Sequence, residues 1–208
     1  MQSIEDIISY CLTKYDNNIV ENIFKNIEDY SPKDLNDIKK LKQLKGSLFE
    51  SWCLLYLKHI KKYNNVWLLK DIPDDVLSKL SLKRNDQGID LVCEHNGKFI
   101  CVQSKFRESK NKSVNWKQLS TFYALCMKTK MDAMLIMTNC SYIKRVGVKY
   151  DNETSICLKS FLSLTRKELE EMIGIKPHKL SDEVKPKIED IRELRLKYFQ
   201  NDNKDDGI

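Results

Sequence analysis

The stretch "GIDLVCEHNGKFICVQSKFR", residues 88–107, decides the fold. Two apolar runs of strand length flank Asn96-Gly97, a dipeptide that supplies the positive φ angles of a type I′ hairpin turn. The sequence therefore predicts a β-hairpin closed at this turn. Its register places Asp90 opposite Gln103, with Lys105 next along the same face. Three polar side chains would then gather on strands that are otherwise apolar.

Residues on both sides of the hairpin show helical and strand patterns. Residues 3–30 predict two short amphipathic helices interrupted near "YDNN". A long helical stripe follows, with Ser31 as N-cap and Pro32 at the first helical position, either as one helix or as two joined at Gly46. The other predicted elements are strands at 66–69, 132–138 and 154–161, a helix at 114–129, and a helix at 165–174 with a Thr cap and a Gly stop.

The order helix, strand, hairpin, helix, strand indicates an α/β or α+β class, with helices packed on a sheet. We expect three segments. Residues 1–38 are an acidic helical extension, residues 39–175 are the core, and residues 176–208 are a charged linker, a helix at 185–199 and a polar tail.

Charge is unevenly distributed along the 208 residues. The net charge of +6 conceals 22 basic and 9 acidic residues between 39 and 149, a net charge of +13. A basic segment is typical of nucleic-acid binding, although solvated faces or coding composition would produce the same counts.

The seven cysteines are odd in number and form no C-x-x-C pair, so we expect reduced core residues rather than zinc ligands. There is no long apolar run or signal peptide, so we expect a soluble intracellular protein without a membrane partner.

The polar cluster suits phosphodiester chemistry. Mg²⁺ prefers oxygen ligands, which the Asp90 carboxylate, the Gln103 amide oxygen and the backbone carbonyl of Ser104 can supply. Lys105 can orient the attacking water or help to deprotonate it. One acid binds Mg²⁺ weakly, so we include Glu50, on the preceding helix, as a further ligand. The alternative is structural: Asp90 caps a turn, while Lys105 and Glu50 lie in solvent.

Five short motifs occur in order between about residues 44 and 140: Gly46-x-x-Phe49-Glu50, Gly88-Ile89-Asp90, Gln103-x-Lys105, Gln118 with Phe122, and Thr138-Asn139. This pattern resembles the PD-(D/E)XK nuclease superfamily, and within it the Mrr-like restriction endonuclease branch, in which Gln replaces the usual acid.

The resemblance implies a restriction-endonuclease-like αβββαβ core, a mixed central sheet flanked by helices, and Mg²⁺-dependent DNA cleavage, for which Mn²⁺ is expected to substitute. By position, Asp90, Gln103 and Lys105 correspond to the family signature and Glu50 to the acid of its first helix. Ser104 replaces the Cys or Ala common in relatives, and its side chain is expected to point away from the cluster.

DNA is the expected partner. The residues expected to contact it are Lys83, Arg84, Arg107, Lys110, Lys112, Lys117 and Gln118. A rival interpretation is a non-catalytic DNA-binding or scaffolding module on the same fold. The sequence leaves open a homodimer, a fused or associated helicase, sequence specificity and the polarity of cleavage.

Overall fold

The predicted hairpin forms the centre of the sheet. Strand β2 (Leu91–His95) pairs antiparallel with β3 (Lys98–Lys105), and Leu91 lies opposite Val102. Asn96 and Gly97 have φ angles of 52° and 75°, as the tight turn requires. The predicted turn and register are therefore confirmed.

The computed structural model describes residues 2–32, 37–85, 88–108, 113–144 and 150–175, which belong to one compact unit. Its main sheet has the strand order β1-β2-β3-β5-β7. Strand β1 (Asn65–Leu68) is antiparallel to β2, whereas β5 (Ala133–Thr138) and β7 (Glu153–Ile156) extend the sheet in parallel from β3. The start of β2 and the ends of β3 and β5 therefore lie at the same end of the sheet.

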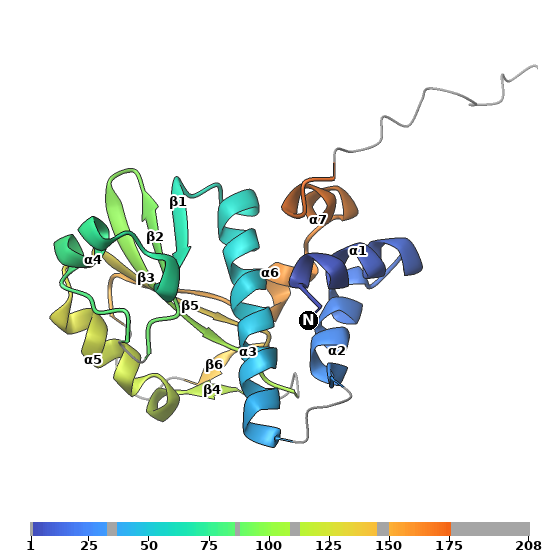
Figure 1. Cartoon of the computed structure of the whole chain (residues 1–208), viewed down its shortest axis with the longest axis horizontal. Helices are drawn as coiled ribbons and strands as arrows, with labels where there is room; N and C mark the ends of the chain where they lie inside the picture. The colour runs from blue at the N-terminus through green and yellow to red at the C-terminus, as the bar shows by residue number, and fades with distance from the viewer. Residues whose placement is uncertain (1, 33–36, 86–87, 109–112, 145–149, 176–208) are drawn as a thin grey trace, which may run out of the picture. The chain divides into compact units, whose positions relative to one another are not determined.

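Helices cover both faces of this sheet (Figure 1). One face packs against α3 (Ile38–Leu55) and, beyond it, against helices from the two ends of the described chain. The other face packs against α4 (Asp74–Leu80) and α5 (Ser120–Lys128). This arrangement is the predicted mixed α/β fold, and α3, β1, β2, β3, α5 and β5 follow the expected αβββαβ order.

The N-terminal helices share the core of the sheet. Helices α1 (Ile4–Lys14) and α2 (Ile19–Asp29) bury their apolar faces in the cluster that also contains Phe49 and Trp52 of α3. The Phe24 ring lies 5.9 Å from Phe49 and 5.2 Å from Trp52, measured between ring centroids. Aromatic pairs at these edge-to-face distances stabilise a core beyond the area that they bury. The acidic N-terminal segment thus supports α3 directly.

Helix α3 differs from its prediction in two ways. It begins at Ile38, because the Asp37 side chain accepts hydrogen bonds from the N–H groups of Lys39 and Lys40. The prediction of Ser31 as N-cap and Pro32 as first helical residue is therefore wrong. The helix also continues without a break through Gly46, so Gly46 is not a joint. A π-helical turn, Tyr56–Ile60, follows directly.

Other helices and strands also have bounds that differ from the predicted ones. The predicted helix at 114–129 starts instead with a short strand, β4 (Val114–Asn115), which pairs with β6 (Ile143–Lys144), and a 3-10 turn, Trp116–Gln118. The predicted strand at 154–161 ends early and gives way to α6 (Leu158–Leu162). A second 3-10 turn, Leu69–Asp71, and α4 were not predicted.

The predictions for the last described helix and for the cysteines are confirmed. Helix α7 (Arg166–Met172) has Thr165 in a capping box, and Gly174 follows with a φ of 72°. All seven cysteines are free thiols and six are buried. The helix predicted at 185–199 lies outside the described residues. Within the described ranges, no helix is both long and apolar enough to cross a membrane.

Candidate active site

The Asp90 carboxylate connects the two central strands at the site. Its Oδ2 atom accepts hydrogen bonds from the Ser104 N–H (2.7 Å), the Ser104 hydroxyl (3.0 Å) and the Gln103 side-chain amide. The backbone N–H of Asp90 donates to the Val102 carbonyl at 2.9 Å. Because these bonds converge on Oδ2, the second oxygen, Oδ1, receives none of the hydrogen bonds found among the described residues. Oδ1 is thus available to a ligand.

Gly88 lets the chain reach Asp90 beside α5. Its φ angle is +117°, which side chains rarely adopt, and a Cβ atom there would lie 3.2 Å from the Phe122 nitrogen and from Thr121 Cγ2. The close approach of the two backbones explains the glycine of Gly88-Ile89-Asp90. It also fixes Asp90 just before the first residue of β2.

The end of β5 holds the end of β3. The hydroxyl of Thr138 donates to the Lys105 carbonyl at 2.7 Å. The amide of Asn139 accepts from the Arg107 N–H at 2.8 Å and donates to the Arg107 carbonyl at 2.7 Å. Both Thr138 and Asn139 are buried, so these bonds are shielded from water. These bonds therefore fix the path of the chain from Lys105 to Arg107, where it leaves β3.

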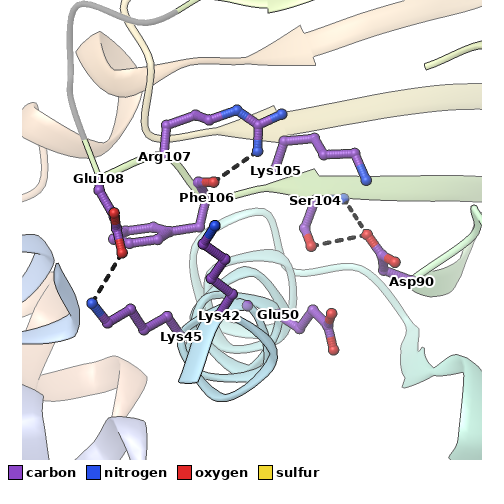
Figure 2. A pocket seen from close by; sticks show the side chains of 10 residues that line it. Lys42, Lys45, Glu50, Asp90, Ser104, Lys105, Phe106, Arg107 and Glu108 are labelled. Carbon is purple, nitrogen blue, oxygen red and sulfur yellow. Dashed lines mark hydrogen bonds and ion pairs between the residues drawn. The ribbon is translucent and has the colours of Figure 1, made fainter. Parts of the chain in front are cut away.

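Glu50 and Asp90 line two neighbouring hollows. The first has a volume of about 420 Å³ and is drawn in Figure 2. The second has a volume of about 470 Å³. Glu50, from α3, and Asp90 line both hollows. Lys105 extends along β3 toward Asp90 in Figure 2, and Ser104 lies between them and α3. The structure thus brings Glu50, Asp90, Ser104 and Lys105 together, as the sequence predicted.

Burial and neighbouring charges shift the pKa values of Glu50 and Lys105. Burial and the nearby charge of Asp90 raise the pKa of Glu50 from 4.5 to about 7. Burial lowers the pKa of Lys105, and Arg107 lowers it further, while Asp90 and Glu50 oppose the shift. Two carboxylates beside a partly desolvated lysine create a position that favours an additional cation.

Two details differ from the sequence predictions. The Ser104 hydroxyl points toward the cluster, because Asp90 precedes β2 and its carboxylate is not confined to one face of the sheet. The amide nitrogen of Gln103 faces Asp90, and Gln103 is only 2% exposed and lines neither hollow. Gln103 therefore acts as a hydrogen-bond donor that fixes Asp90.

The residues expected to contact DNA are dispersed. Arg107 lines the first hollow and Arg84 the second. The Arg84 guanidinium also donates to Asp74 (2.6 Å) and to the Lys70 carbonyl (2.8 Å). Gln118 caps its own 3-10 turn through Asn115. Lys83 and Lys117 are exposed, and Lys110 and Lys112 lie outside the described residues.

The sequence interpretation missed three lysines at the site. Lys42 and Lys45 on α3 line the first hollow, and Lys70 lines the second. The signal for Lys42 was helical spacing, because residues 42, 46 and 50 lie on one face at intervals of four. No local pattern connects Lys70 with the site, since it lies in an unpredicted 3-10 turn.

Oxygen atoms dominate the donors that could hold a metal. The described residues contain no group of three or more His, Cys, Asp or Glu side chains arranged around a common point. The available set is instead two carboxylates, Glu50 and Asp90, together with Ser104, which lines the first hollow and whose carbonyl lies 3.4 Å from the Gln103 amide nitrogen. Such a set fits a hard cation that retains waters or takes further oxygens from its substrate, which is the usual behaviour of Mg²⁺.

Comparison with protein families identifies this arrangement. The family model for Mrr-type restriction endonucleases matches residues 58–168, which are 111 of the 208 residues. The chain belongs to the Mrr-like restriction endonuclease family. No curated protein and no solved structure matches the chain significantly. The family is one of nucleases, and the matched region of this Mrr-like domain includes Asp90, Gln103 and Lys105 but begins after Glu50.

Glu50 should make the protein less stable as pH rises. Its pKa in the folded state exceeds the ordinary value, so the penalty for ionising it begins near pH 4.5 and is complete above about pH 7. We predict that Glu50→Gln raises the free energy of unfolding at pH 8 by about 1–2 kcal/mol, allowing for solvent screening. Urea denaturation across pH should show this gain disappearing below about pH 4. Asp29→Asn, at an exposed position on α2, is the control; an equal gain at every pH would contradict the assignment.

Gln103 should stabilise the metal-free site. Gln103→Glu replaces the donor to Asp90 by a second carboxylate, so unfolding in EDTA should become easier by about 2 kcal/mol. Mn²⁺ should restore much of the loss, because a cation relieves repulsion between the two acids. Thermal melts with EDTA and with Mn²⁺ measure both effects. Gln43→Glu, which makes the same substitution at an exposed position on α3, is the matched control. An unchanged melting temperature in EDTA would show that Gln103 does not contact Asp90.

Proposed function

We propose that this Mrr-like domain is a metal-dependent endodeoxyribonuclease. The observation that carries the proposal is that Glu50 and Asp90 both line the two hollows, and that Lys105, from β3, lines the first hollow beside them. Acids from two separate elements converge there with a lysine, although burial makes such convergence unfavourable without a function. Membership of a nuclease family supports the same conclusion.

Glu50, Asp90 and the Ser104 carbonyl are the proposed metal ligands. Oδ1 of Asp90 is the free oxygen of that carboxylate, while Oδ2 anchors it to β3. The sequence also nominates Gln103, whose amide would have to turn over to offer its oxygen. When bound, Mg²⁺ or Mn²⁺ would polarise a phosphoryl oxygen and make a bound water more acidic.

Lys105 is the proposed catalytic cation. Its side chain is partly buried and extends toward Asp90, so its ammonium can donate hydrogen bonds to the attacking water or to a phosphate oxygen. Hydrogen bonds with Thr138 and Asn139 fix the backbone that follows its side chain, at the Lys105 carbonyl and at Arg107. Positioned donors of this kind stabilise charge that develops in the transition state.

Basic residues beside the site provide the proposed DNA contacts. Lys42 and Arg107 border Glu50 and Asp90 in one hollow, and Lys70 and Arg84 border them in the other. A strand whose scissile phosphate lies at Asp90 would therefore find cations on both sides. Such contacts release counterions, so binding should weaken as salt increases.

Cleavage and binding should separate in two variants. We predict that Asp90→Asn and Lys105→Met each reduce Mn²⁺-dependent cleavage of supercoiled plasmid by at least about a hundredfold. Asparagine retains an oxygen that can accept the Ser104 N–H, whereas alanine would leave that buried donor without a partner. Binding to the same DNA in EDTA should change much less, because Asp90 acts on the metal and Lys105 is only one of several cations beside the site.

The controls are Asp151→Asn and Lys159→Met, which remove the same charges at exposed positions away from the site. Full cleavage by Asp90→Asn would refute the nuclease site. Wild-type protein that binds DNA without cutting it in Mg²⁺ or Mn²⁺ would favour the non-catalytic binding module instead.

A further inference from the structure

Gly46 has no packing reason to be a glycine. It lies inside the continuous helix α3, where glycine is less favourable than alanine. A Cβ atom built on it meets no atom within 4 Å, so neighbouring residues do not exclude a side chain. Gly46 nevertheless lines the hollow that contains Glu50 and Asp90. A ligand that occupies the hollow would therefore explain why residue 46 is a glycine.

Lys45, the residue before Gly46, is buried and paired. It is 8% exposed, and its ammonium lies 3.0 Å from Oε1 of Glu108. Lysine is rarely buried at this level unless an anion accompanies it. The Glu108 side chain is half exposed and follows the end of β3 by three residues. Its carboxylate thus places an anion next to Lys45 within the hollow.

Two further cations border the same part of the hollow. In Figure 2, the Lys42 ammonium points into the space between the Lys45–Glu108 pair and Ser104. Arg107, two residues after the end of β3, also lines this hollow. In the view of Figure 2, Lys42 and Arg107 lie between Glu50 and Asp90 on one side and Lys45 with Glu108 on the other. Cations are concentrated in the part away from the proposed metal ligands.

We propose that Lys42, Lys45, Gly46 and Arg107 form a subsite that binds a phosphate of the DNA backbone. When DNA is absent, the Glu108 carboxylate occupies this subsite. This inference rests on the proposed nuclease function and extends it. A phosphate that flanks the scissile bond would replace Glu108 as the partner of Lys45, so the buried ammonium would never lack an anion. Gly46 would allow the sugar-phosphate backbone to approach α3 without meeting a Cβ atom.

A phosphate fits this position better than a carboxylate ligand or an apolar group. The subsite offers two ammonium groups and one guanidinium, and phosphate oxygens accept several charge-assisted hydrogen bonds at once. It also continues directly from the proposed cleavage position, within a single hollow. DNA that is held at Asp90 must extend its backbone on one side or the other, and this side contains the buried lysine.

Two substitutions and their combination test the subsite through DNA binding. The measurement is the Kd for a fluorescein-labelled duplex in EDTA, where no cleavage occurs. Lys45→Met should raise the Kd by about tenfold, the usual effect of losing one charge-assisted hydrogen bond. Glu108→Gln should lower the Kd severalfold, because DNA no longer competes with a carboxylate. In the double variant this gain should disappear, since the competitor acts only through Lys45.

Gly46→Ala should make the protein more stable and its DNA binding weaker. The alanine should raise the melting temperature by about 2–4 °C through helix propensity, and it should raise the Kd severalfold by obstructing the backbone. A binding loss in a more stable protein cannot come from misfolding. Lys25→Met and Asp29→Asn, which alter exposed charges on α2, are the controls.

The subsite is refuted if Lys45→Met and Gly46→Ala both bind like wild type while wild type binds and cuts DNA. It is equally refuted if Glu108→Gln binds more weakly than wild type, because the carboxylate would then be part of the interface. Failure of wild type to bind or cut DNA refutes the proposed function itself. The two failures are therefore distinguishable in one set of measurements.

Discussion

The hydrogen bonds to Oδ2 of Asp90 are the constraint on which the site depends. They join the entry of β2 to the end of β3 through Ser104 and Gln103. A carboxylate in this position satisfies buried donors, and leaving such donors without a partner is costly. The same contacts leave Oδ1 available to a ligand and bring Ser104 and Lys105 to the edge of the sheet. The fold and the proposed chemistry therefore rely on one side chain.

The sequence predicted the parts of this arrangement that depend on local patterns. Asn96-Gly97 fixed the hairpin register, and the register placed Asp90 beside Gln103. The sequence did not predict that Ser104 would bond to Asp90, because strand alternation does not govern a residue that precedes the strand. It also missed the cap at Asp37, because Ser31-Pro32 offered a competing start signal, and it did not predict α4. Lys70 and Glu108 reach the site only through tertiary packing, which no local pattern encodes.

The unfavourable burial of charge at the site is offset by packing elsewhere in the protein. Glu50 ionises reluctantly in its buried position, and the same burial strengthens any interaction with a cation. The aromatic packing of Phe24 against Phe49 and Trp52 anchors α3 and therefore holds Glu50 in place. Rigid support of this kind is expected where a protein maintains unfavourable charges for function. The N-terminal helices, which lie outside the matched family region, thus contribute to the site.

The most direct measurement of the central claim is anomalous diffraction from crystals of the protein grown with Mn²⁺ and a DNA duplex. The account predicts a manganese peak in contact with Oδ1 of Asp90, the Glu50 carboxylate and the Ser104 carbonyl, with a DNA phosphate beside it. A peak elsewhere, or an Asp90 carboxylate bound only to Ser104 and Gln103 in the presence of Mn²⁺ and DNA, would contradict it.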